Sequence, residues 1–264
     1  MKRVCEIAQL DYTLIGGGDL TINEIEGRLQ FAIPCRWIPT DTSLGNAPGY
    51  FYVAPGARFS FWDGPDRGYM TSPNLFGAYV DVGVEPRINK NFALEAWLRV
   101  GLYSDYEKVT KDSWRLQGRV MATFLIADRW QGAVGVMYLD RNQVKILPSG
   151  GVIWTPHDDI ICRLTFPDPK ISMRITRAGT TEWWGYLLAD YGGGTWTIKD
   201  QNTGQSERTD YNDIRVAVGL EFNNPRCIKG FAEIGGAFGR ELVRPGWQTY
   251  KPGSALFFRI GMKY

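Results

Sequence analysis

The side chains that most often perform chemistry are few in this chain and lie far apart. His157 is the only histidine among 264 residues, so a hydrolase that uses histidine as its general base would depend on this one. It lies in the segment "TPHDDI", where neither Asp158 nor Asp159 is an obvious partner to orient its ring. A solvated turn is the simpler interpretation, and we expect the protein not to be an enzyme.

The cysteines predict no metal site. Cys5, Cys35, Cys162 and Cys227 are widely separated and include no C-x-x-C pair, the spacing that a zinc centre normally requires. We therefore expect free thiols that are buried or face lipid, and neither a metal nor a cofactor.

Two segments rich in aromatic residues and glycine have both a chemical and a structural interpretation. "YGGGTW" (191–196) would cradle a phosphate only if a helix N-terminus followed it, and a bulge or bend in a long strand fits better. "WWGY" (183–186) has rings that stack on sugars elsewhere, but in a strand its two Trp residues face opposite sides. We favour the structural interpretation of both segments.

Charged residues at alternate positions of otherwise apolar segments are the remaining candidates. In a closed barrel they would point into the lumen and tune which solutes pass, or they would pair with one another and hold the strands together. The sequence leaves both interpretations open. The candidate lumen-lining residues are Arg58, Asp81, Glu85, Glu95, Arg99, Arg115, Arg119, Arg163, Arg215, Glu221 and Arg259, with Glu24, Glu26 and Arg28 on the same face.

A repeat of two residues places these charges on β-strands. In "SWRLQGRVMATFLI" (113–126), apolar Val120 and Phe124 alternate with Arg115 and Arg119. No linker, internal repeat or sustained helical period interrupts the pattern, so residues 1–264 are predicted to form one all-β domain. About fourteen strands are expected, at 4–14, 20–34, 50–62, 75–86, 92–103, 113–126, 130–139, 145–155, 160–166, 170–176, 182–198, 208–222, 228–240 and 255–264. Twelve are possible, because 160–176 and the triple glycine interrupt the alternation.

Strand and turn lengths indicate a single closed antiparallel transmembrane barrel. Many segments reach ten residues, and a bilayer core requires about 9–11 tilted residues per strand. The connections alternate in length, and most short ones share an end with Tyr264, as in outer-membrane barrels. Long "WIPTDTSLGNAPG" and short "PDP" break this pattern. Aromatic residues are predicted to form a girdle at each end, with Phe92, Trp130, Trp154 and Tyr264 at the short-turn end and Phe61, Trp114 and Tyr138 at the other.

The last ten residues, "ALFFRIGMKY" (255–264), are apolar or aromatic at every second position up to the end of the chain. This ending resembles the C-terminal assembly signal of bacterial outer-membrane proteins, and the residues that match it are Phe258, Ile260, Met262 and Tyr264. The resemblance implies two partners, the barrel-assembly machinery and the lipid of the outer membrane.

Three internal segments resemble an uncharacterised family of outer-membrane-type β-barrels of Gram-negative bacteria. They are "VAPGARFSFWDGP" (53–65), "RWQGAVGVMYLDRNQVKILPSGGVIWTP" (129–156), and "FPDPK" followed by "WWGYLLADYGGGTW" (166–196). The resemblance implies a barrel in the cell outer membrane and supplies no substrate. The start of the chain, "MKRVCEIAQLDYTLIGGG", has no continuous apolar segment, so no signal peptide is expected in it.

The charge distribution excludes nucleic acid as a partner, and two functions remain. A formal net charge of +2 with scattered Lys and Arg gives no basic stripe for nucleic acid. The predicted function is therefore porin-like passive passage of small polar solutes, or a structural barrel, without catalysis. The alternative is a soluble all-β carbohydrate-binding protein that uses its aromatic residues. Such a sandwich must show one polar face to water, whereas here one face is too apolar for solvent and the other too charged for a core.

Overall fold

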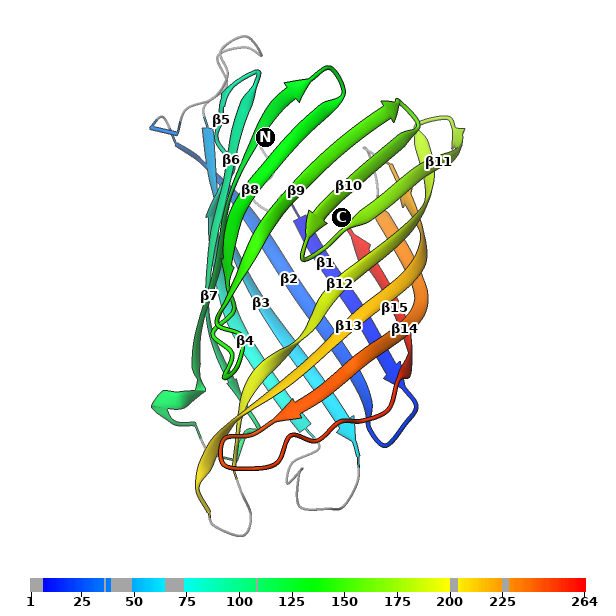
Figure 1. The fold of residues 1–264 in the computed structure, drawn as a ribbon. Coiled ribbons are helices and arrows are strands. Elements are labelled where there is room, and N and C mark those ends of the chain that lie inside the picture. Colours follow the sequence, from blue (N-terminus) through cyan, green and yellow to red (C-terminus); the bar gives the residue numbers. More distant parts are fainter. Residues whose placement is uncertain are drawn as a thin grey trace.

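Fourteen antiparallel strands close into one barrel (Figure 1). The computed structural model describes residues 7–35, 37–38, 49–64, 74–107, 109–199, 204–224 and 228–264. The strands of the wall are β1 (Ile7–Gly16), β2 (Thr21–Cys35), β3 (Gly49–Asp63), β4 (Asn74–Val84), β6 (Phe92–Ser104), β7 (Trp114–Ala127), β8 (Trp130–Tyr138), β9 (Ile146–His157), β10 (Ile160–Phe166), β11 (Lys170–Ala178), β12 (Thr181–Lys199), β13 (Ser206–Asn223), β14 (Lys229–Val243) and β15 (Ala255–Lys263). The short strand β5 (Arg87–Asn89) extends the edge of β6, and the single-turn helix η2 (Lys111–Ser113) precedes β7.

Two strand pairings close the wall into a barrel, and we call each of them a seam. β4 pairs with β6 from Phe76↔Ser104 to Val84↔Ala96, and β1 pairs with β15 from Gln9↔Lys263 to Gly16↔Leu256. Beyond β15, the backbone of Tyr264 exchanges two hydrogen bonds with Ala8, at 2.8 and 3.1 Å. The end of the chain is therefore an ordered part of the wall, because pairing with β1 satisfies backbone groups that would otherwise form a free sheet edge.

The alternation of residues decides which side chains face outward. Phe124, which alternates with Arg115 and Arg119 in the sequence, is exposed, as is Val218, and Phe258 shares its face of β15 with exposed Leu256 and Ile260. The opposite face of β15 carries Phe257, which is fully buried. The barrel thus has an apolar exterior, and its polar side chains turn inward.

The two ends of the barrel differ as the turn lengths predict. The turns after β7, β9 and β11 are short, and they share an end with the chain terminus, so His157 and Tyr264 lie at one end. We call this the terminus end (top of Figure 1) and the opposite end the loop end. Most of the exceptional "WIPTDTSLGNAPG" lies outside the described residues. The short "PDP" turn joins two short strands, β10 and β11. β12 is longer: Leu188 pairs with Lys170 at the start of β11, and β12 then continues to Lys199.

An apolar cluster fills the barrel interior toward the loop end. It includes the fully buried Trp196, Tyr211 and Phe257, together with Trp62 and Ile15. Alternation predicts charged side chains on the inner face, and this apolar cluster was not predicted. Among the described residues, no helix is long and apolar enough to cross a membrane.

Candidate functional site in the barrel interior

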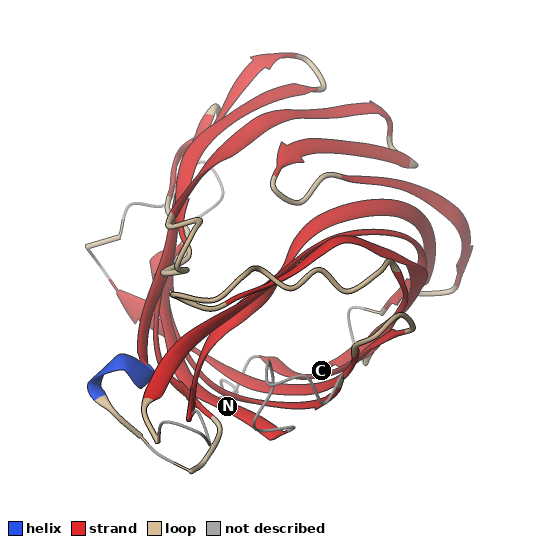
Figure 2. Ribbon diagram, turned by 60° about the horizontal axis from the view of Figure 1, so that its bottom comes forward, coloured by secondary structure: helices blue, strands red, loops and turns tan. Residues whose placement is uncertain are grey.

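The hairpin of β12 and β13 leaves the wall and crosses the lumen. Its two strands stay paired from Glu182↔Asn223 to Lys199↔Ser206, but Thr197 also lies in parallel register with Ser104 of β6. The Thr197 hydroxyl donates to the Asp112 carbonyl oxygen of η2 at 2.6 Å and accepts from Arg115 Nη2 at 3.0 Å. Figure 2 shows strands crossing the mouth of the barrel toward η2, drawn in blue. We call residues 194–199 and 204–211 of this hairpin the plug.

The triple glycine provides the bend at the base of the plug. Gly193 has φ +100°, a conformation that L side chains rarely adopt, and a Cβ there would lie 1.9 Å from the Tyr211 carbonyl oxygen. The facing strand is irregular between Asn212 and Ile214, where the register with β14 shifts. The predicted bend in "YGGGTW" is therefore confirmed. The bulge in β13 lies opposite this bend, and together they turn both strands into the lumen.

Aromatic side chains pack one side of the plug against β3. The Trp62 ring on β3 meets the rings of Trp196 and Tyr211 edge-on, with centroids 5.3 and 5.6 Å apart. All three side chains are about 2% exposed. The plug therefore has an apolar core of its own against the opposite wall.

Polar contacts hold the other side of the plug. From the loop between β8 and β9, Arg141 donates to the Asn212 side chain at 2.6 Å and to the Gly192 carbonyl at 2.9 Å. Burial lowers the pKa of the Arg141 guanidinium below its ordinary value. The backbone N–H of Asn142 donates to Asp210 at 2.6 Å. These contacts are not periodic in sequence, and sequence reasoning missed them.

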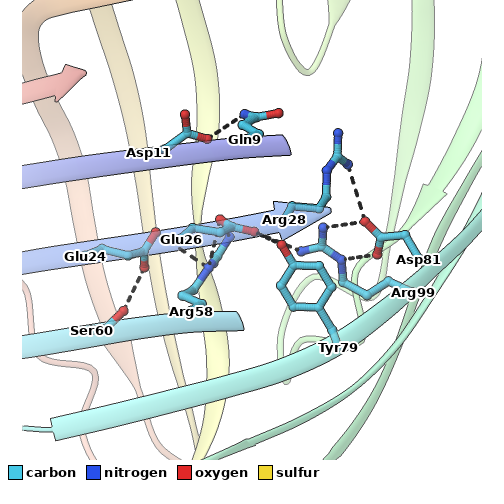
Figure 3. A network of polar contacts seen from close by, with 10 residues as sticks. All are labelled: Gln9, Asp11, Glu24, Glu26, Arg28, Arg58, Ser60, Tyr79, Asp81 and Arg99. Carbon is cyan, nitrogen blue, oxygen red and sulfur yellow. Dashed lines mark hydrogen bonds and ion pairs between the residues drawn. The ribbon is translucent and has the colours of Figure 1, made fainter. Parts of the chain in front are cut away.

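A first charge network lines the lumen between β1 and β6 (Figure 3). Arg58 pairs with Glu26 at 2.6 Å and lies 3.6 Å from Glu24. Arg99 forms a forked pair with Asp81, at 2.6 and 2.9 Å, and Arg28 approaches the same carboxylate at 3.4 Å. Tyr79 donates to Glu26.

A second charge network lies on the wall opposite the first one and joins residues of strands β12 to β15. Arg259 pairs with Glu233 at 2.6 Å and with Asp190 at 3.5 Å, and Arg215 pairs with Asp213 at 3.1 Å. The carboxylates Asp190, Asp213 and Glu233 were not among the predicted residues. Their alternation with Leu187, Ile214 and Ile234 is the sequence signal that would have revealed them.

The other predicted residues are placed as follows. Arg119 pairs with Glu95 at 2.5 Å and approaches Asp168 of the "PDP" turn at 3.7 Å, and Glu221 pairs with Lys170 at 2.7 Å. Partial burial raises the pKa of the Asp168 carboxyl. Arg115 belongs to the plug contacts, Arg163 lines a recess beside Lys170, and Glu85 is exposed just after β4.

Two cavities follow these networks down the lumen. One, of about 230 Å³, lies against the plug, and the other, of about 260 Å³, lies beside Arg28 and Arg99. Asp11, Glu26 and Arg58 line both cavities. The interior therefore offers two adjoining polar spaces, one of which lies against the plug.

The residues weighed for catalysis do not form a site. His157 is two-thirds exposed at the terminus end, where its Nδ1 accepts a hydrogen bond from the Asp159 backbone N–H at 3.3 Å and lies 3.1 Å from the Asp159 carboxylate. Asp159 also pairs with Arg174, which makes the contact part of a surface charge cluster. Among the described residues, no group of three or more His, Cys, Asp or Glu is arranged to hold a metal.

The remaining candidates behave as structural residues. Trp183 packs on Phe222 at 5.4 Å, whereas Trp184 faces inward and is buried, as alternation requires. Cys162 is buried and Cys35 half-buried, both as free thiols, while Cys5 and Cys227 lie outside the described residues.

Comparison with known proteins gives structural neighbours only. No family model matches the chain, and no curated protein does. Among solved structures, it is similar to the KdgM porin, with 10% identity, a TM-score of 0.41, and coverage of 97% of this chain and 98% of that one. It is also similar to the COG4313 outer membrane channel from Pseudomonas putida F1, with 11% identity, a TM-score of 0.44, and coverage of 100% and 96%. The pairing of its own strands and its apolar exterior give this chain the fold of an outer-membrane-type β-barrel, closed by fourteen strands.

Proposed function

We propose that the protein is a non-catalytic barrel of the outer membrane that admits small polar solutes into its lumen, with the plug as the constriction. The terminus end faces the periplasm and the loop end faces the exterior, in keeping with the distribution of turn lengths. The plug then closes the barrel on the outer side.

The exterior supports a membrane location. Leu256, Ile234 and Val218 are 73%, 59% and 57% exposed on three neighbouring strands. In water this surface would be a large apolar patch, whereas in a bilayer it is the required lipid-facing band. The alternative of a soluble carbohydrate-binding protein needs a polar exterior and is therefore disfavoured.

Aromatic residues support the same location at both ends. Trp130 and Trp154 stack with centroids 5.1 Å apart at the terminus end, and Trp114, Phe61 and Tyr138 are exposed at the loop end. Amphipathic rings prefer the boundary between lipid and water.

The single observation that carries the function is the position of the plug across a charged lumen. Arg58, Arg99 and Arg259 of the inner wall each pair with a carboxylate, so a passing polar solute meets hydrogen-bonding groups without a strong field of one sign. The second candidate, a purely structural barrel, is favoured by the dense contacts that hold the plug. The two candidates differ in whether the plug ever leaves the lumen.

Single-channel recording in planar bilayers tests the proposal. We expect wild type to give small, intermittent currents, and a variant with residues 195–210 replaced by two glycines to give larger, sustained ones. A disulfide between Ser104→Cys and Thr197→Cys, with all four native cysteines changed to Ser, should abolish the currents until a reductant is added. Each single cysteine variant is the matched control.

Heat-modifiable mobility on gels verifies folding for every variant. Folded wild type that never conducts, together with a trimmed variant that does, identifies a structural barrel with a fixed plug. If both stay silent when folded, the lumen is not a solute path.

A further inference from the structure

The cavity against the plug has the features of a binding site. We infer that it holds one neutral polyhydroxylated molecule of monosaccharide size. This inference rests on the proposed function only in that the ligand enters the lumen from the terminus end.

Position and size define the class of ligand. The cavity lies between β1, β2 and β3 on one side and β12, β13 and β15 on the other, and Trp62, Trp196 and Tyr211 belong to its lining beside the plug. Its volume of about 230 Å³ holds roughly eight waters at the ~30 Å³ that each occupies in the liquid. It therefore suits one small solute and not a chain.

Charge disfavours an anion. Each guanidinium of the lining already has a carboxylate within 3.1 Å: Arg58 with Glu26, Arg215 with Asp213, and Arg259 with Glu233. An anion would have to compete with these pairs, and breaking a buried pair leaves an uncompensated charge.

Two neighbouring groups on β1 belong to the lining. Asp11 accepts a hydrogen bond from the Gln9 amide through Oδ2 at 2.6 Å and forms no ion pair among the described residues, while its Oδ1 has no partner and no surface open to water. Thr13 lies two residues further along the same face and also lines the cavity. A carboxylate accepts only, while a hydroxyl both donates and accepts, so ligand hydroxyls match both groups.

The lining also supplies aromatic surface. The rings of Trp62, Trp196 and Tyr211 border the cavity, and the indole N–H groups of the two Trp residues have neither an acceptor among the described residues nor a surface open to water. A hydroxyl, a carboxylate and aromatic rings around one small space are a combination that a sugar uses, since its ring presents hydroxyls at the edge and C–H groups on the face.

Binding to the full-length barrel in detergent tests the inference without requiring passage. Isothermal titration calorimetry and saturation-transfer NMR are run with methyl glucoside and methyl galactoside, with 1,4-diaminobutane as a cationic probe and citrate as an anionic one. We expect one of the glycosides to bind with a stoichiometry of one, and neither charged probe to compete with it.

Two conservative variants locate the site. Asp11→Asn and Thr13→Val keep the shape of each side chain and should weaken glycoside binding roughly tenfold or more, the loss expected for one hydrogen bond to a charged or buried group. Glu85→Gln, a carboxylate change outside the cavity, is the matched control and should bind like wild type. Heat-modifiable mobility confirms that each variant is folded.

The outcomes separate this inference from the proposed function. Glycoside binding without any conductance retains the site and removes the solute path. Conductance without binding of either glycoside overturns the site and leaves the path. Preferential binding of the diamine identifies a cation site, and binding unchanged in both β1 variants places the ligand elsewhere; either result overturns the inference.

Discussion

Thr197 lies in register with Ser104, although five strands, β7 to β11, separate β12 from β6 in the sheet. The contact is a chord across the barrel, and it exists because β12 bends inward at the triple glycine. Closure of the loop end is thus built from strands that also belong to the wall, and its stability is linked to theirs.

Replacing Gly193 with Ala should loosen this closure. The positive φ and the 1.9 Å approach to the Tyr211 carbonyl force the backbone to shift, at a cost of about 1 kcal/mol or more. We expect a lower unfolding temperature and a higher open probability in bilayers. Gly179→Ala, at a positive φ in an open turn of the terminus end, is the control: it should lower stability and leave conductance unchanged. Equal currents from both variants would contradict the role of Gly193 in bending β12 into the lumen.

Removing the Arg240 side chain should unseat the plug. Arg240 is 1% exposed and donates to Tyr211 Oη at 3.0 Å, to the Leu20 carbonyl at 2.5 Å, and to the carbonyls of Gly17 and Gly253 at 3.1 Å each. Arg240→Met leaves several buried acceptors unpaired, and we expect a loss of about 3 kcal/mol or more in the free energy of unfolding. Denaturant titration measures it, with exposed Arg177→Met as the neutral control. A loss below about 1 kcal/mol would show that water replaces the guanidinium.

Arg99→Gln should destabilise the first charge network. Asp81 is only 3% exposed, and its forked pair with Arg99 would be lost, with Arg28 left as a distant partner. Breaking a buried pair from one side costs about 3–5 kcal/mol, and the Arg99 side chain is 15% exposed, so we expect the lower end of that range. The double variant Arg99→Gln/Asp81→Asn should recover part of the loss in denaturant titration. No recovery would mean that Arg99 acts mainly through its contact with the Tyr79 ring, at 3.6 Å.

The last strand should be the most sensitive stretch for its length. Deleting residues 262–264 removes the backbone pairing of Tyr264 with Ala8 and exposes unpaired groups to lipid, so we expect no heat-modifiable barrel. Phe258→Asp places a charge on the lipid face, which costs up to ~2–4 kcal/mol for a basic residue at mid-membrane and less for an acid. Half-buried Lys263 changed to Gln should fold normally. A deletion variant that assembles like wild type would refute the role of this strand as a seam and assembly signal.

Sequence periodicity predicts the strands of the wall and does not predict the plug. Alternation predicts the wall because lipid on one side and a polar lumen on the other impose a period of two. It does not predict that β12 turns inward after Tyr191, because glycine permits a bend without setting its direction. The contacts of Arg141 and Arg240 join loops to strands far apart in sequence, and no local pattern encodes them. The same alternation lists the interior charges, and it also marks Asp190, Asp213 and Glu233, which were missed.

Arg240 also sets an order of events in folding. Its partners Gly17 and Leu20 precede it by more than 200 residues, at separations of 223 and 220, and Gly253 follows it in the loop that leads into β15. Contacts of such separation form late, since loop-closure entropy must be overcome first. One guanidinium therefore joins the first turn of the chain, the last loop and the plug. Until β1 and β15 pair, Arg240 lacks its partners in both loops and cannot hold Tyr211 of the plug, so we expect completion of the wall and closure of the loop end to occur together.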